Sequence, residues 1–282
     1  MQICKKVSEV RQIVKEQRQN GRTIALVPTM GYLHEGHLTL VKEAQKDGAF
    51  VVMSIFVNPL QFGPNEDFER YPRDLKQDAL KAEEAGVDVI FAPEVEEMYP
   101  GKNLTYVEVG ELGDCLCGAS RPGHFRGVTT VVSKLFHIVQ PDKAYFGQKD
   151  YQQYLIIRQM VKDLNFPIEI IGVPIVREKD GLALSSRNVY LTPEQRKEAL
   201  VLQKSLKEAE KWIKEGERSA SRIEEKIKNL IREESSGEID YVEVRSAENL
   251  KKLEEISGKV LIALAVRFGS TRLIDNRVLE EK

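Results

Sequence analysis

The chain has 282 residues, with 42 basic and 44 acidic side chains and a formal net charge of −2. This near-neutral balance argues against a nucleic-acid-binding protein that relies on overall basicity, and the length allows one large α/β domain or a larger and a smaller one. Three cysteines without a C-x-x-C pair, no apolar signal region and no bilayer-length apolar run lead us to expect a cytoplasmic protein that is neither exported nor membrane-bound.

The first predicted elements are a helix, a strand and a second helix. Residues 7–20 carry apolar side chains at helical spacing, with Ser8 as a candidate cap. The apolar, β-branched run 23–27 ends at Pro28 and predicts a buried parallel strand. A further helix is expected from Gly36 onward, where apolar and polar positions again alternate with a helical period.

The alternation of strands and helices continues along the chain. Residues 49–57 predict a second strand, 74–85 a helix and 87–91 a third strand. This β-α-β-α-β order implies a parallel sheet with right-handed crossovers. The intervening loop 58–73 is rich in Pro, Gly, Asn and aromatic residues, and a loop of this length is more often functional than idle.

The middle of the chain extends the same pattern. Residues 104–109 are a candidate strand, 128–139 an apolar helix, 143–146 a short strand, 151–164 a helix and 168–176 another strand. Ligands of open parallel sheets bind outside the carboxyl ends of the strands. The polar loops that follow these strands are therefore expected to converge on one cleft.

The last third of the chain changes in character. Residues 193–216 and 219–234 are charge-rich helical segments, and 241–244 and 260–266 are candidate strands. We therefore predict a domain boundary near Val176, followed by a small α+β domain.

Two of the four histidines lie where the first strand passes into its helix. His34 and His37, three residues apart, would share one face of the helix start, where unpaired N–H groups and the helix dipole suit a phosphate. Gly36 would let a ligand approach the backbone. The alternative is that both histidines merely cap the helix. Metal binding by this pair is disfavoured, since the spacing is not H-E-x-x-H and no third ligand is near.

Two further segments carry groups suited to anions. Lys149 stands at an expected helix start, where a cation opposes the dipole unless an anion lies between them, although a solvated surface lysine is the competing interpretation. Ser185, Ser186 and Arg187 follow a glycine in a loop and could bind phosphate oxygens, although a plain turn would also account for them.

Other polar side chains have weaker signals. Arg121, His124 and Arg126 in RPGHFRG form either an anion clamp or a surface turn. Gln61 and Gln153 carry amides that can donate and accept, but either could be an ordinary glutamine. The chain has neither a G-x-x-x-x-G-K-[ST] loop nor a G-x-G-x-x-G after the first strand, which argues against a Walker-type NTPase and a dinucleotide dehydrogenase. An α/β nucleotide site remains.

Five motifs follow one another along the chain: VPTMGYLHEGH, SIFVNPLQFGPNEDFERYPR, RPGHFRGV, YFGQKDYQQ and VREKDGLALSSRN. In this order they resemble the motif series of the pantothenate synthetase (pantoate–β-alanine ligase) family. That family belongs to the nucleotidyltransferase superfamily, in which HEGH corresponds to the HIGH-type signature and LSSRN to the KMSKS-type loop. The resemblance implies a Rossmann-like, doubly wound parallel sheet in residues 1–175 and a smaller α+β lid domain in residues 176–282.

The resemblance also implies an activity. ATP and pantoate would give pantoyl adenylate and pyrophosphate with Mg²⁺, and β-alanine would then displace AMP to give pantothenate. The expected partners are these small molecules and a second copy of the chain in a homodimer, with no nucleic acid and no membrane.

Family roles fall on matching residues of this sequence. His37 is expected to act as proton donor, with His34 at the phosphates, and Lys149, Ser185 and Arg187 are directed at phosphates. Val176 would pack near the adenine. The full set expected around ATP is Met30, Gly31, Tyr32, Leu33, His34, Glu35, Gly36, His37, Gly147, Gln148, Lys149, Asp150, Val176, Leu184, Ser185, Ser186 and Arg187.

The remaining family roles concern pantoate and the metal. Gln61 and Gln153 would hold pantoate, with Gln61 also near β-alanine. Some relatives have two adjacent acidic residues associated with magnesium, and the corresponding pair here is Gln77 and Asp78, so that Asp78 is the one candidate metal ligand.

Two alternatives stay open at the level of sequence. A nucleotidyltransferase acting on a phosphorylated small molecule would share the H-x-G-H site. A nucleotide-sensing or RNA-binding module without turnover would share the fold, but the absence of basic runs disfavours it.

Overall fold

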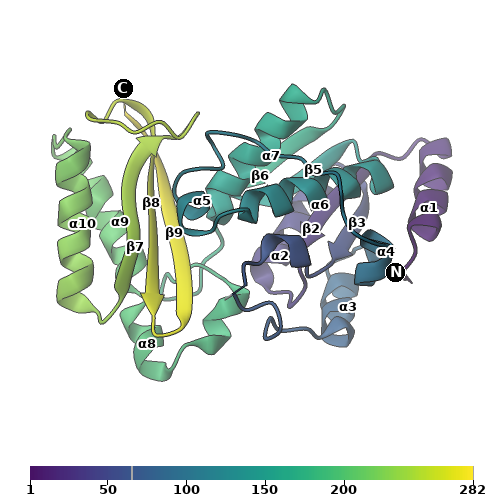
Figure 1. Cartoon of the computed structure of the whole chain (residues 1–282), viewed down its shortest axis with the longest axis horizontal. Helices are drawn as coiled ribbons and strands as arrows, with labels where there is room; N and C mark the ends of the chain where they lie inside the picture. The colour runs from purple at the N-terminus through teal and green to yellow at the C-terminus, as the bar shows by residue number, and fades with distance from the viewer. Residues whose placement is uncertain (65, 282) are drawn as a thin grey trace.

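The computed structural model describes residues 1–64 and 66–281 of the chain. It contains a six-stranded parallel sheet with the strand order β1-β4-β3-β2-β5-β6 and a three-stranded antiparallel sheet with the order β7-β8-β9 (Figure 1). The two sheets lie side by side, each with its own helices. This architecture confirms the predicted fold class of a doubly wound sheet followed by a smaller α+β part.

The strands of the first sheet are β1 (Gln2–Cys4), β2 (Ile24–Thr29), β3 (Phe50–Ile55), β4 (Val89–Phe91), β5 (Lys143–Gly147) and β6 (Glu169–Val173), and those of the second are β7 (Glu238–Ser246), β8 (Gly258–Phe268) and β9 (Thr271–Glu281). The α-helices are α1 (Val7–Gln19), α2 (Glu35–Gln45), α3 (Leu75–Glu84), α4 (Val95–Met98), α5 (Cys117–Ser120), α6 (His124–Val139), α7 (Tyr151–Asp163), α8 (Pro193–Glu198), α9 (Val201–Lys214) and α10 (Ala220–Glu234). Three short 3₁₀ helices are η1 (Pro59–Gln61), η2 (Gln148–Asp150) and η3 (Ser186–Tyr190).

Both faces of the parallel sheet are covered, because alternate residues of each strand point to opposite sides. In β2, Ile24 and Leu26 belong to the core that contains α1, α6 and α7. Ala25 and Val27 belong to the core that contains α2 and α3. All four side chains are fully buried, which explains why this strand has a continuous apolar sequence.

The order of the strands creates a switch point between β2 and β5. From β2 the sheet grows through β3 and β4 in one direction, and β5 and β6 extend it in the other. Ala25 pairs with Lys143 and Leu26 with Ala144 at this junction. In open parallel sheets the crevice at such a point is where ligands bind, and the segments that leave β2 and β5 carry His34 and Lys149.

Several local predictions were wrong. Strand β2 continues through Pro28 to Thr29. Strand β5 pairs with β2 only at Ala25 and Leu26, so the missing N–H of Pro28 leaves no hydrogen bond to β5 unmade. Ser8 lies inside α1 and does not cap it. Residues 104–109 form no strand; instead, the N–H of Val107 donates to the hydroxyl of Thr130.

Other elements begin earlier than expected or were missed. Helix α6 starts at His124, so this histidine lies on a helix rather than in a loop. Strand β1 is too short to give a periodic signal, and β9 is interrupted by charged side chains that its partly exposed face tolerates.

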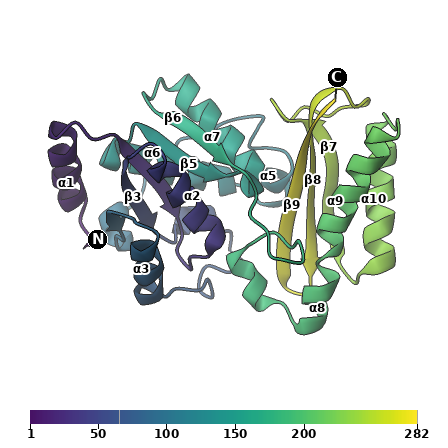
Figure 2. The ribbon, with the colours of Figure 1, turned by 180° about the vertical axis from the view of Figure 1, so that it is seen from behind.

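The second sheet has a core of its own. Helices α9 and α10 lie on the side of the sheet that faces away from the rest of the chain, as both views show (Figures 1 and 2). Their buried residues pack with those of β7 and β8. In residues 1–64 and 66–281, no helix combines the length and the apolar character that a bilayer crossing requires.

Candidate active site

The turn between β2 and α2 is built on helix α3. Gly31 and Tyr32 both have positive φ, of 85° and 50°, which turns the chain sharply after β2. The carboxylate of Asp78 accepts hydrogen bonds from the backbone N–H groups of Tyr32, at 2.8 Å, and Leu33, at 2.6 Å. Lys81 donates to the carbonyl of Leu33 at 2.7 Å. Side chains of α3 therefore hold the turn in place without a ligand.

His34 and His37 both cap helix α2 through one ring nitrogen. Nδ1 of His34 accepts from the N–H of Gly36 at 3.1 Å, and Nδ1 of His37 accepts from the N–H of His34 at 3.3 Å. A neutral imidazole that accepts at Nδ1 carries its proton on Nε2. The capping interpretation is thus correct for Nδ1, and it leaves an Nε2–H donor on each ring.

The surroundings keep both rings neutral. Burial, together with the charge of Lys149, lowers the pKa of His34 to about 4. Burial, with His34 and Lys149 nearby, lowers the pKa of His37 well below its ordinary range. At neutral pH both histidines therefore act as uncharged hydrogen-bond donors.

Most of the predicted ATP-site residues meet in one cavity of about 220 Å³, which we call the nucleotide cavity. Its wall includes Met30, His34, Gly36, His37, Gln61, Gly147, Lys149, Asp150, Gln153, Val176, Leu184, Ser185, Ser186 and Arg187. A second hollow of about 960 Å³, the interdomain groove, lies between the two sheets and shares Gln61, Lys149, Asp150, Gln153, Ser185 and Arg187 with it. The chain thus has two adjoining hollows that share six wall residues.

Lys149 stands at the carboxyl end of β5, in the 3₁₀ turn η2. Its side chain is 19% exposed, and Nζ lies 3.8 Å from the carboxylate of Asp150. It lines both the nucleotide cavity and the interdomain groove. This position argues against a solvated surface lysine.

The segment Ser185–Arg187 adopts a capped turn and reaches the first loop. The hydroxyl of Ser185 accepts from the N–H of Arg187 at 3.2 Å, and the hydroxyl of Ser186 donates to the carbonyl of Tyr32 at 3.4 Å. Arg187 forms a bidentate pair with Asp67, at 3.0 and 2.8 Å. Burial raises the pKa of Asp67, but the hydrogen bonds and charge of Arg187 outweigh this effect and the pKa is lowered overall.

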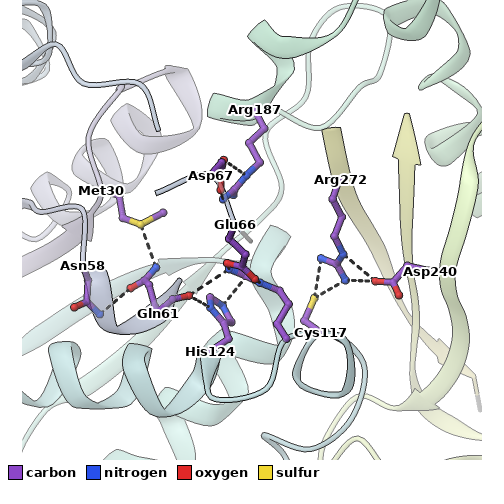
Figure 3. Close-up of polar contacts among 11 residues, drawn as sticks. Met30, Asn58, Gln61, Glu66, Asp67, Cys117, His124, Arg187, Asp240 and Arg272 are labelled. Atoms are coloured by element: carbon purple, nitrogen blue, oxygen red, sulfur yellow. Dashed lines mark hydrogen bonds and ion pairs between the residues drawn. The ribbon is translucent and has the colours of Figure 1, made fainter. Parts of the chain in front are cut away.

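Gln61 lies at the junction of the two hollows and is held by its neighbours (Figure 3). Its Nε2 donates to the sulfur of Met30 at 3.1 Å, and its Oε1 accepts from Asn58 at 3.2 Å. The backbone carbonyl of Gln61 lies 2.8 Å from Nδ1 of His124. The side-chain amide is therefore oriented by Met30 and Asn58, and the backbone of Gln61 contacts His124.

The RPGHFRG segment is tied to the loop that carries Gln61 and Glu66. Arg121 pairs with Glu66, at 2.7 and 2.5 Å, and lies 3.0 Å from Nε2 of His124. Burial and the charge of Arg121 lower the pKa of His124 to about 4. Figure 3 shows Glu66 and Asp67 of one loop reaching toward His124 and Arg187, respectively.

Asp78 does not fit the role of a metal ligand. Its side chain is 2% exposed, and each of its oxygens accepts a backbone N–H from the turn above it. Among the residues that the structure describes, no group of three or more His, Cys, Asp or Glu side chains is arranged to hold a metal ion. The residues expected around ATP that lie outside the cavity wall are Gly31, Tyr32, Leu33, Glu35 and Gln148.

Two site residues escaped the sequence interpretation. Asn58 is 1% exposed and holds Gln61, and the Asn-Pro pair that begins three residues after strand β3 is a usable signal for a side-chain-capped turn. Asp67 pairs with Arg187, and nothing local in the sequence connects these two residues.

The arrangement suits a reaction at a polyphosphate. Two neutral imidazole N–H donors, a lysine and an arginine surround a helix N-terminus, so that negative charge developing on phosphate oxygens would be stabilised. In this arrangement these groups can act as hydrogen-bond donors and cations.

Comparisons with known proteins agree with this geometry. The family model described as pantoate-beta-alanine ligase matches residues 2–278. A pantothenate synthetase from Desulfitobacterium hafniense is 83% identical over 280 residues, covering 99% of both chains. The crystal structure of pantothenate synthetase from Thermus thermophilus is 48% identical with a TM-score of 0.93, over 98% of this chain and 99% of that one.

A third match is a pantoate-beta-alanine ligase from Francisella tularensis, whose structure was determined in complex with beta-gamma ATP and beta-alanine. It is 35% identical, with a TM-score of 0.80, and the match covers 99% of this chain and 97% of that one. On the family model and these full-length matches, the chain belongs to the pantoate-beta-alanine ligase family.

Proposed function

We propose that the nucleotide cavity and the interdomain groove carry out the ATP-dependent ligation of pantoate and β-alanine to pantothenate. The observation that supports this most directly is that His34, His37, Lys149 and Arg187, from three separate segments, line one cavity that adjoins a second hollow. Gln61 lines both spaces, where a small hydroxy acid would meet the nucleotide.

In the first step the carboxylate of pantoate attacks the α-phosphorus of ATP and pyrophosphate leaves. We assign His37 and Lys149 to the phosphate oxygens on which charge develops, with His34, Ser185 and Arg187 on the rest of the polyphosphate. Each donor of this kind is commonly worth about a hundred- to a thousandfold in rate. Because both imidazoles are neutral, their Nε2–H groups would donate hydrogen bonds without adding charge.

In the second step the amine of β-alanine attacks the acyl carbon of pantoyl adenylate and AMP leaves. This step mainly requires the two reactants to be held in register. We assign Gln61 and Gln153 to pantoate, and Gln61 also to the vicinity of β-alanine. The support is the position of both glutamines in the wall shared by the two hollows.

Mg²⁺ is proposed to bind together with ATP. Since Asp78 is fully engaged by the turn above it, we propose that Mg²⁺ is held by phosphate oxygens and water, which is ordinary for this ion. No step is assigned to a protein-bound metal.

Three further features are proposals that rest on the family. Residues 176–282 would close as a lid domain over residues 1–175, narrowing the interdomain groove. The chain would form a homodimer, and the exposed side chains of Leu104 (80%) and Tyr106 (45%) offer apolar surface for it. The compartment would be the cytoplasm. Elution volume with light scattering would test the dimer.

Pyrophosphate exchange tests the reaction itself. Labelled pyrophosphate should enter ATP when pantoate is present and β-alanine is absent, because the adenylation step is reversible. Exchange without pantoate, or equal exchange with unrelated acids, would contradict the proposal. Product analysis separates it from a nucleotidyltransferase, because only the ligase releases AMP and an amide.

A further inference from the structure

Asn276 of strand β9 reaches across from the second sheet to the turn that carries Lys149. Its side-chain amide donates to the carbonyl oxygen of Gln148 at 3.0 Å and to that of Lys149 at 2.8 Å. Asn276 is 6% exposed, so this contact is shielded from water. Figure 1 shows β9 at the side of its sheet that lies nearest to the larger part of the molecule.

The two carbonyls have a special relation to Lys149. The carbonyl of Gln148 belongs to the peptide plane before the Cα atom of Lys149, and the carbonyl of Lys149 belongs to the plane after it. Each peptide unit is planar, so the orientations of these two planes determine φ and ψ of Lys149 and the direction of its Cα–Cβ bond. An NH₂ group has two hydrogens, which matches two acceptors. One side chain thus contacts both peptide planes that flank Lys149.

The neighbouring residue on β9 holds the other phosphate-directed loop. Asp275 forms a bidentate pair with Arg177, at 2.7 and 2.8 Å, and its side chain is 1% exposed. Arg177 in turn donates to the carbonyl of Gly181 at 3.1 Å, within the turn that precedes Ser185. The backbone N–H of Asn276 donates to Asp275 at 2.8 Å, which couples the two contacts.

We propose that Asn276 is a positioning residue for the adenylation step, which acts by fixing the direction of the Lys149 side chain. The inference rests on the role assigned to Lys149 above and deepens it. The second sheet then contributes to the geometry of the reaction site as well as covering it. Asn276 itself contacts backbone atoms of η2 and is assigned no contact with the reacting atoms.

A double-mutant cycle on pantoate-dependent pyrophosphate exchange tests this directly. Asn276→Ala should lower turnover by about tenfold to a hundredfold, since a small misplacement of a catalytic group has effects of this size. In a Lys149→Ala background, the same change should cause no further loss, because the two residues act as a unit. A purely structural role would lower both backgrounds equally, and that result would overturn the inference.

A second readout is which of the two reaction steps the substitution Asn276→Ala impairs. Starting from pantoyl adenylate prepared separately, the reaction with β-alanine should proceed at nearly the parental rate in Asn276→Ala, since Lys149 is assigned to the phosphate chemistry. Equal losses in both steps would contradict a role through Lys149. If Lys149→Ala alone leaves exchange unchanged, the assignment of Lys149 fails. If Lys149→Ala lowers exchange while Asn276→Ala does not affect it, only the present inference fails.

Two more variants guard against misfolding. Asn276→Asp keeps the size and polarity of the side chain but turns a donor into a carboxylate facing two carbonyl oxygens, so it should lose exchange at least as strongly; parental turnover would overturn the inference. Arg277→Ala is the matched control, because Arg277 lies next along β9 and pairs with Glu210 of α9 instead. A loss equal to that of Asn276→Ala would point to a loosened strand and overturn the inference.

Discussion

The imidazole rings of His34 and His37 lie with their centroids 4.0 Å apart, and each Nδ1 is occupied by a backbone N–H of the same helix start. The pair is therefore oriented by the chain segment that contains it. Two charged imidazoles at this separation would repel each other, and burial opposes the charge of either ring. The helix start accordingly presents hydrogen-bond donors rather than fixed positive charges.

Replacing His37 should impair adenylation selectively. His37→Ala removes an Nε2–H donor from the nucleotide cavity, and we expect turnover in pyrophosphate exchange to fall by about two orders of magnitude or more. The thermal unfolding midpoint should fall only slightly, since one helix-capping hydrogen bond is lost and the fold persists. The matched control is His137→Ala on the exposed side of α6, which should exchange normally. Near-normal turnover of His37→Ala would remove it from the catalytic residues.

The charge state of His34 can be followed directly by pH titration. With a pKa of about 4, its ring resonance in a ¹H–¹³C spectrum should titrate well below the ordinary histidine range near 6.5. His34→Gln identifies the resonance. A midpoint near 6.5 would show that the ring is not desolvated as the structure requires.

The same shift has a consequence for stability. In the unfolded chain His34 takes up a proton below about pH 6.5, whereas in the folded chain it stays neutral until about pH 4. The unfolded state therefore binds more protons in this window, and the free energy of unfolding should fall as the pH falls from about 6.5 toward 4. Urea unfolding at several pH values measures this slope, which should be shallower in His34→Gln. An unchanged slope would contradict the linkage.

Asp67 forms an ion pair with Arg187, whose guanidinium group we assign to the phosphates of ATP. Asp67→Asn removes the negative partner of Arg187, so the KM for ATP should decrease several-fold, with a smaller change in turnover. Glu69→Gln, an exposed carboxylate of the same loop, is the control for a general change in charge. A raised KM for ATP in Asp67→Asn would mean that the pair positions Arg187 for the nucleotide instead of competing with it.

Asp78 should behave as a structural residue. Asp78→Ala leaves the N–H groups of Tyr32 and Leu33 without their acceptor, and we expect the free energy of unfolding to fall by about 1–3 kcal/mol per group left unpaired. The Mg²⁺ concentration that half-saturates exchange should not change in Asp78→Asn. A large shift in that concentration would restore Asp78 as a metal ligand.

The sequence predicted those parts of the site that local patterns encode. The H-x-G-H turn stands between an apolar strand and an amphipathic helix, and Lys149 follows a short strand, so their positions at strand ends could be read from periodicity. Contacts between distant segments have no such signal. Asp67 with Arg187 and Asp78 with the Tyr32 turn depend on tertiary packing, and a lone carboxylate in a sequence does not reveal its partner.

Strand β9 illustrates a different difficulty. Its buried residues Asp275 and Asn276 are polar, because each is satisfied by a partner outside its own sheet, and this breaks the apolar alternation that marks a strand. The apolar alternation is therefore lost in β9 where the second sheet contacts the first part of the molecule. Strand prediction from alternation is expected to fail at such contacts.

The pairing of Ala25 with Lys143 has a consequence for how the protein matures. During synthesis the histidine turn leaves the ribosome long before β5, so the nascent chain cannot form the switch-point crevice until both strands are available, and closing so long a loop is slow. In the proposed site ATP contacts segments that follow both strands, so it would bind only the completed sheet. It should therefore act as a stabilising ligand of the mature chain, shifting the folding equilibrium by mass action.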